Sequence, residues 1–133
     1  MIVVDTNVIA YLFFEGERTL QAESVLEVDG EWVAPLLWRS EFCNVLVSLF
    51  RKGVLSLDVG VRIMREAQRL MQDKEFEVAS AHVLRLAAES GCSAYDCEFV
   101  SLAQSLNVAL VTSDKGILRE FPSTAISIEA FIS

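Results

Sequence analysis

Two carboxylates stand at or just beyond the ends of short apolar runs. Asp5 follows Ile2–Val4 in the stretch MIVVDTN, and Asp114 follows Val108–Val111 in the stretch NVALVTSDKG. Runs of this length predict buried strands. Ligands bind beyond the carboxyl ends of the strands in parallel sheets, so both acids are expected at that edge. Each could instead cap the helix that follows it, although Asn7 could cap the first helix in place of Asp5.

Two further acids lie inside predicted helices, and helical periodicity places them on different faces. Glu41 belongs to the predicted helix 37–52, and its neighbours at helical spacing are the polar residues Asn44, Ser48 and Arg51. That stripe is typical of a solvated face. Asp96 instead shares its stripe with apolar residues, namely Phe99, Val100 and Ala103. An unpaired buried carboxylate is costly, so Asp96 is expected to complete the capping pattern Ser93-x-x-Asp96, to bind a ligand, or to do both.

Together, the four acids indicate a cation site more strongly than any one of them does alone. Carboxylates gathered at one edge of a sheet repel one another, which raises their pKa values unless a cation neutralises them. Ligand sets made only of oxygen select hard ions such as Mg²⁺ or Mn²⁺. Such ions activate water and stabilise charge at a phosphodiester. The four candidates for this chemistry are Asp5, Glu41, Asp96 and Asp114.

Other catalytic chemistries have little support. The sequence contains neither of the two common glycine-rich nucleotide-binding motifs, and His82 is its only histidine. This leaves little room for a Ser-His-Asp triad, a Cys-His pair or a histidine-based zinc site. The three cysteines, Cys43, Cys92 and Cys97, lack metal-ligand spacing. We expect them to be buried reduced thiols, as in a cytoplasmic protein.

Length and composition predict one domain spanning residues 1–133. No apolar run approaches the length of a membrane span, and the N-terminus does not resemble a signal peptide. The net charge of −8 argues against a nucleic-acid binder with a broad basic face, but not against an enzyme whose acids hold metal ions. Hydrophobic residues make up 53% of the chain. This apolar excess predicts a symmetric homodimer that includes helical surface from the first half of the chain. The patch Phe13, Phe14, Leu46, Leu49 and Phe50 is expected to be mainly core, and some of it could belong to the dimer face.

Strands and helices are expected to alternate along the chain. The predicted strands are residues 2–4, 31–35, 76–79, 108–112 and 125–128. The predicted helices are residues 7–14, 18–28, 37–52, 57–72, 80–89, 94–106 and 115–121, with a helical stub at the end. Such alternation predicts an α/β fold, a three-layer α/β/α sandwich around a mostly parallel sheet of about five strands.

Three stretches of the sequence resemble the PIN domain family, and in particular the VapC-type toxin ribonucleases of prokaryotic toxin–antitoxin pairs. The stretches are MIVVDTNVIAYLF, WRSEFCNVL and SAYDCEFVSLAQSLNVALVTSDKGIL. The resemblance covers the whole chain and is strongest in the first ten residues and in Ser93–Leu118. The acids of the family's site fall by motif on Asp5, Glu41, Asp96 and Asp114. Polar residues beside these acids match Asn7 and Thr112, with Ser113 next to them.

The resemblance implies a PIN-like fold and an endoribonuclease that cleaves single-stranded RNA with Mg²⁺ or Mn²⁺, and the reduced cysteines predict a cytoplasmic location. It also implies a homodimer and, often, a cognate antitoxin. In this interpretation Asp5, Glu41 and Asp96 hold the first metal, and Asp114 places a second metal or the attacking water. Asn7 and Thr112 orient these ligands. Phosphates would meet the basic side chains Arg39, Lys115 and Arg119.

Two alternatives stay open. One is a Mg²⁺-dependent phosphohydrolase with Asp5 as the nucleophile, although the familiar version needs a second Asp at the position of Asn7. The other is a PIN-like binding module without turnover.

Overall fold

Five short parallel strands form one sheet in the computed structural model, which describes residues 1–133. The strands are β1 (Ile2–Val4), β2 (Trp32–Pro35), β3 (Glu75–Phe76), β4 (Leu110–Thr112) and β5 (Ala125–Ser127). Their order across the sheet is β3-β2-β1-β4-β5, and all four neighbouring pairs are parallel. The chain therefore builds the sheet in one direction from β1 to β3 and in the other direction from β4 to β5.

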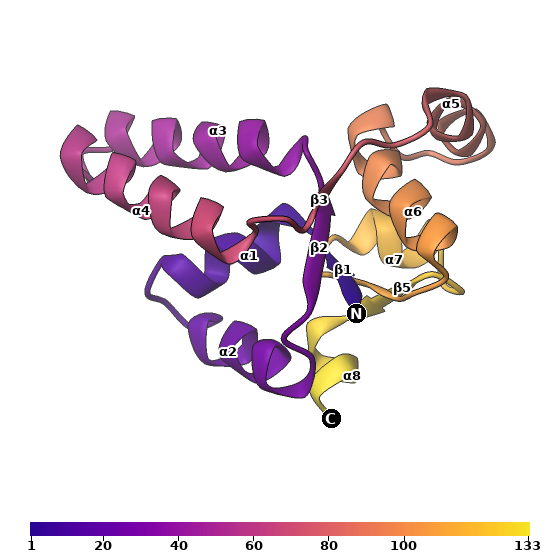
Figure 1. The fold of residues 1–133 in the computed structure, drawn as a ribbon, viewed down its shortest axis with the longest axis horizontal. Coiled ribbons are helices and arrows are strands. Elements are labelled where there is room, and N and C mark those ends of the chain that lie inside the picture. The colour runs from indigo at the N-terminus through magenta and orange to yellow at the C-terminus, as the bar shows by residue number, and fades with distance from the viewer.

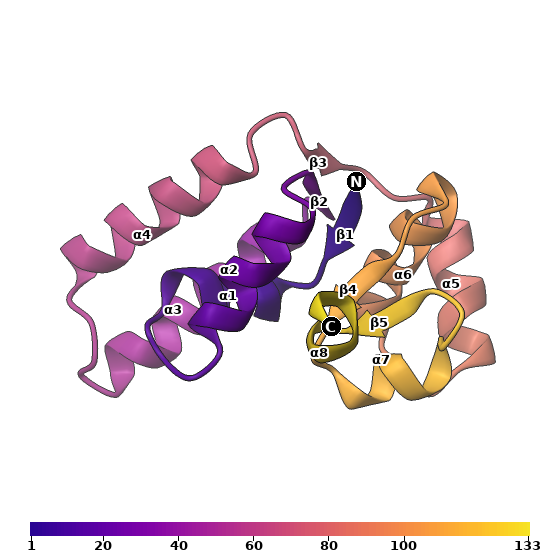
Figure 2. The same cartoon turned by 90° about the horizontal axis from the view of Figure 1, so that it is seen from below.

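Helices cover both faces of this sheet. They are α1 (Thr6–Phe13), α2 (Thr19–Val28), α3 (Trp38–Arg51), α4 (Leu57–Leu70), α5 (Ser80–Glu89), α6 (Ala94–Leu106), α7 (Lys115–Glu120) and α8 (Ile128–Ile132). Figure 1 shows α1 to α4 on one side of the strands and α5 to α7 on the other. Helices α3 and α4 form a hairpin that extends away from the sheet, as Figure 2 also shows. The predicted three-layer α/β/α sandwich is confirmed.

The sheet lies at the centre of the core. Every residue of β1, β2 and β4 is buried, which explains why β1 and β2 are uninterrupted apolar runs and why β4 departs from this pattern only at Thr112. The largest buried side chains outside the strands include Trp38 and Phe42, whose rings pack edge to face with centroids 5.7 Å apart. These two residues anchor the first turns of α3 against the core. The direction of α3 at the edge of the sheet is thereby fixed.

Two sequence predictions are wrong in detail. The third strand is residues 75–76 rather than 76–79, because its only partner, β2, ends at Pro35 and offers no pairing beyond Phe76. The cysteines are not all buried. Cys43 is exposed on α3 and Cys92 is half-buried, whereas Cys97 is fully buried, and all three are free thiols. No helix is both long and apolar enough to span a membrane.

Candidate active site

The structure brings the four predicted acids together in one pocket of about 250 Å³. We call it the acid pocket, and it is lined by Asp5, Thr6, Asn7, Glu41, Val45, Asp96 and Asp114. The acids come from the end of β1, the first turns of α3 and α6, and the turn after β4. Strands β1 and β4 are neighbours, and between them the direction of sheet building reverses. The acid pocket therefore lies at the topological switch point, where open α/β sheets bind their ligands.

Asp5 is held in place by three donors. Its side chain is buried, and it accepts hydrogen bonds from the Thr6 backbone N–H at 2.8 Å and the Thr112 hydroxyl at 2.7 Å. The Asn7 amide nitrogen lies 3.4 Å from the same carboxylate. Asp5 is also the N-cap of α1, so the prediction that Asn7 could replace it as the cap is wrong. Capping and pocket lining are therefore combined in one carboxylate.

The surroundings of Asp5, Glu41 and Asp96 disfavour the charged forms of these three carboxylates. The pKa of Asp5 is raised to about 6, mainly by burial and also by the nearby Glu41 and Asp96, while the hydrogen bonds from Thr112 and Thr6 oppose the rise. Burial is also the main cause of the raised pKa of Glu41 and of Asp96. The charge of Asp114 adds to the effect on Asp96. A bound cation would relieve both the desolvation and the mutual repulsion.

Glu41 is not the solvated residue that its helical stripe predicts. Its carboxylate is half-buried and accepts a hydrogen bond of 2.6 Å from the Thr6 hydroxyl of α1. The remaining residues of the stripe, Asn44, Ser48 and Arg51, are exposed as expected. Sequence analysis missed Thr6, which binds Asp5 through its backbone and Glu41 through its side chain. The sequence did offer one indication of Thr6, because it lies between the candidate residues Asp5 and Asn7.

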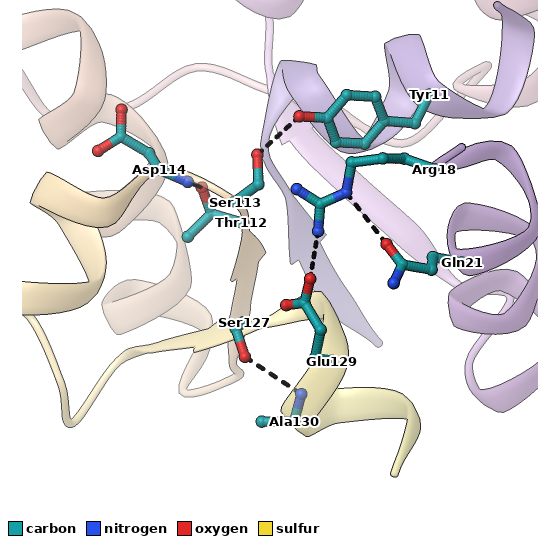
Figure 3. Close-up of polar contacts among 9 residues, drawn as sticks. All are labelled: Tyr11, Arg18, Gln21, Thr112, Ser113, Asp114, Ser127, Glu129 and Ala130. Carbon is teal, nitrogen blue, oxygen red and sulfur yellow. Dashed lines mark hydrogen bonds and ion pairs between the residues drawn. The ribbon is translucent and has the colours of Figure 1, made fainter. Parts of the chain in front are cut away.

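Asp96 and Asp114 both stand at helix N-termini. The Ser93 hydroxyl caps α6 by accepting a hydrogen bond from the Asp96 backbone N–H at 3.1 Å. The Asp114 carboxylate caps α7 by accepting from the Ile117 backbone N–H at 2.9 Å. The Thr112 hydroxyl accepts a hydrogen bond from the Asp114 backbone N–H at 3.0 Å (Figure 3). The same hydroxyl donates a hydrogen bond to Asp5. One buried hydroxyl thus fixes two of the four acids relative to each other.

Ser113 lies elsewhere. Figure 3 shows its hydroxyl directed toward Tyr11 of α1, with 3.0 Å between the two oxygens. It does not line the acid pocket. This contact joins the turn after β4 to α1. The ring of Tyr11 also contacts the Arg18 guanidinium, which lies 5.0 Å from the ring centroid. Ser113 therefore supports the frame of the site rather than contributing to its wall.

The three predicted basic residues differ in availability. The Arg39 guanidinium is engaged by the carboxylate of Glu75 on β3, which also accepts a hydrogen bond from the Trp38 indole. Arg39 is therefore committed to joining α3 to the edge of the sheet. Lys115 and Arg119 are exposed on α7, directly after Asp114. Neither forms an ion pair in this structure, so both are free to meet an anion near the acid pocket.

The donor chemistry of the acid pocket fits a hard divalent cation. Its polar walls carry carboxylate, hydroxyl and amide groups and no sulfur or imidazole ligand. The Asn7 side-chain oxygen is buried without a hydrogen-bond partner, and its amide is held in that orientation by the contact between its nitrogen and Asp5. Such an orphaned acceptor suits a cation or a water bound to one. In this structure no group of three acidic, histidine or cysteine side chains lies close enough together to hold one ion. The acidic side chains would therefore move closer together when an ion binds.

Fold and pocket together define an α/β protein with a carboxylate site at its switch point. The sequence model of the PIN domain family matches residues 2–122, and the chain belongs to this family. It is 32% identical over 127 residues to Ribonuclease VapC3 from Pyrobaculum aerophilum, covering 92% of this chain and 95% of that protein. The crystal structure of PAE2754 from P. aerophilum has the same fold, with a TM-score of 0.79 at 23% identity, covering 98% of this chain and 92% of that one.

Proposed function

We propose that this protein is a Mg²⁺- or Mn²⁺-dependent endoribonuclease that cleaves single-stranded RNA. The observation that carries the proposal is the acid pocket, in which four carboxylates from four separate segments meet at the switch point of the sheet. Membership of the PIN domain family supports it, as does the similarity to a protein named as a ribonuclease. No histidine lines the acid pocket, so no imidazole is available there to activate water in place of a metal.

Each side chain of the pocket has a role in this proposal. Asp5, Glu41 and Asp96 would hold the first metal, and Asp114 would place a second metal or orient the attacking water. The chemistry supplied by Mg²⁺ or Mn²⁺ in such a site is activation of water at neutral pH and stabilisation of charge on the phosphodiester.

The surrounding residues orient these ligands and meet the substrate. The Thr112 and Thr6 hydroxyls hold Asp5 and Glu41 in fixed orientations through their hydrogen bonds. The free Asn7 oxygen would accept a hydrogen bond from a metal-bound water or bind the metal itself. Lys115 and Arg119, exposed beside Asp114, would attract the phosphates of the strand.

A cleavage assay with a matched control tests this function. Single-stranded RNA is incubated with the wild type, with Asp96→Asn and with Glu23→Gln, an exposed acid on α2 outside the acid pocket. The wild type and Glu23→Gln should cleave in Mg²⁺ or Mn²⁺ and stop in EDTA, whereas Asp96→Asn should be at least about 100-fold slower because a first-metal ligand is lost. Cleavage that persists in EDTA, or full activity of Asp96→Asn, would rule the mechanism out.

We also propose that the protein acts as the toxin of a toxin–antitoxin pair in the cytoplasm, where its three cysteines would stay reduced. The similarity to Ribonuclease VapC3 supports the pairing. A short neighbouring reading frame for a DNA-binding protein that restores growth on co-expression is the expected finding. Growth unaffected by expression of the protein alone would contradict the toxin role.

A homodimer is the third part of the proposal. Apolar side chains are exposed in the first half of the chain at Val54, Leu57 and Val61, around the α3–α4 hairpin. Surface of this kind marks an interface when it is continuous. Light scattering should therefore give the mass of two chains at micromolar concentration, and a monomer at high micromolar concentration would contradict the dimer.

A further inference from the structure

A second hollow opens beside the acid pocket. It has a volume of about 320 Å³ and is lined by Leu37, Ser40, Glu41, Asn44 and Tyr95. We call it the Tyr95 hollow. It shares Glu41 with the acid pocket, and Tyr95 immediately precedes Asp96 in the chain. The two sites are therefore adjacent, and a ligand that extends out of the acid pocket past Glu41 enters the Tyr95 hollow.

Tyr95 is the only exposed aromatic side chain of the protein. Its exposed fraction is 63%, whereas every phenylalanine and tryptophan, and the other tyrosine, is buried or half-buried. The aromatic pairs of the structure all involve Phe42, so the ring of Tyr95 stacks on no other ring. Aromatic rings pair in offset-stacked or edge-to-face arrangements, so a ring without such a partner leaves its face free for a planar ligand. Its position at the rim of a carboxylate site makes a planar ligand the natural occupant.

The other walls of the Tyr95 hollow suit such a ligand. Leu37 provides a half-buried apolar surface, while Ser40 and Asn44 are exposed on the same side of α3. A serine hydroxyl and an asparagine amide each offer both donor and acceptor groups to the edge of a planar heterocycle. The hollow thus combines a stacking face with hydrogen-bonding groups, the combination by which proteins hold unstacked bases of single-stranded RNA.

We propose that the Tyr95 hollow is a nucleobase subsite, which receives a base next to the scissile phosphodiester and stacks it on Tyr95. The inference rests on the proposed ribonuclease function and extends it to the way in which the strand is held. It accounts for a preference for single strands, because a base must leave its stack to reach Tyr95. A chain of net charge −8 also needs a source of RNA affinity other than phosphate contacts, and stacking is uncharged.

The test compares Tyr95→Ala with Tyr95→Phe on two RNAs, using Leu20→Ala on α2 as a control at another exposed apolar side chain. One RNA is an intact single strand whose cleavage position is mapped with the wild type. The other carries abasic residues on both sides of that position. Binding of both RNAs is measured in EDTA, and KM and kcat are measured in Mn²⁺.

Tyr95→Ala should weaken binding of the intact RNA and raise its KM by about 5- to 150-fold, the loss expected for one stacked base. Tyr95→Phe should retain most of the affinity because it keeps the ring. On the abasic RNA the wild type and Tyr95→Ala should be equal. The subsite would be overturned if wild type and Tyr95→Ala had equal binding and KM on intact RNA. It would also be overturned if Tyr95→Phe were as defective as Tyr95→Ala. Neither outcome would contradict the proposed ribonuclease function. A wild type that neither binds nor cleaves single-stranded RNA would overturn both proposals.

Discussion

Replacing Asp5 with Asn should stabilise the metal-free protein at neutral pH. The change keeps the size of the side chain and its capping role, since Asn and Asp are equally good N-caps. It removes a charge whose pKa is raised from 3.8 to about 6, mainly by burial. A rise of about two pKa units corresponds to about 3 kcal/mol of cost to the folded state when the group is ionised. Loss of one hydrogen bond, such as that from Thr112, offsets about 1 kcal/mol of the gain.

The size of the stabilisation depends on pH. Above pH 6 Asp5 is ionised in both the folded and the unfolded chain, so the cost to the folded state is fully present. As the pH falls from about 6 towards 4, the folded state takes up the proton first, and the cost disappears. The advantage of Asp5→Asn over the wild type should therefore be about 1–3 kcal/mol at pH 7.5, or about 3–10 °C in Tm, and should shrink by pH 4.5.

Thermal unfolding in EDTA at the two pH values measures this difference, with Glu23→Gln as the control for loss of an exposed charge. Mn²⁺ at 1,000 times the Kd of the wild type should then reverse the order, because it stabilises the wild type by about 4.1 kcal/mol and the variant, which lacks a ligand charge, by much less. A less stable Asp5→Asn in EDTA at pH 7.5, with Glu23→Gln unchanged, would refute the reasoning. It would mean that the hydrogen bonds of Asp5 outweigh the burial of its charge.

Three further predictions concern the supports of the site and the hairpin. Thr112→Val should lower the free energy of unfolding in urea by about 1–3 kcal/mol and weaken Mn²⁺ binding, because Asp5 and the backbone N–H of Asp114 each lose a hydrogen-bond partner. Thr112→Ser keeps the hydroxyl and should behave as the wild type in both measurements. Gly60→Ala should cost about 1–3 kcal/mol, since its Cβ would clash with the Phe50 ring. Phe50→Leu in the same chain should recover part of the loss, and no loss in Gly60→Ala alone would show that the ring moves freely. Val61→Asp should shift the light-scattering mass from two chains to one, and an unchanged dimer would place the interface elsewhere.

The fold was predictable because its signals are local. The runs ending at Val4 and Val111 are wholly apolar since their strands are covered on both faces, and each is followed by residues that cap a helix. The third strand was less predictable. Its length is set by the end of β2 at Pro35, a partner 40 residues away, and nothing within residues 76–79 reports it.

The site was predictable only in part. Asp5 and Asp114 follow strands, so the parallel topology alone brings them to one edge. Glu41 was misplaced because helical periodicity describes one helix in isolation, whereas its burial comes from a contact with Thr6, 35 residues earlier. Family resemblance predicted Glu41 to lie with the other three acids, where the structure places it, and periodicity did not. Tyr95 gave no signal before its exposure beside the acid pocket was known, since an aromatic residue in a helix is usually part of the core.

The most direct test of the metal-bound acid pocket is a Mn²⁺ titration followed by two signals in the same samples. One signal is binding of Mn²⁺ to the protein, and the other is the rate of cleavage of single-stranded RNA. Both should rise together in the wild type, return to zero in EDTA, and be lost or strongly weakened in Asp5→Asn while Glu23→Gln behaves as the wild type. Cleavage that is independent of Mn²⁺ occupancy, or Mn²⁺ binding that is unchanged in Asp5→Asn, would contradict the central claim.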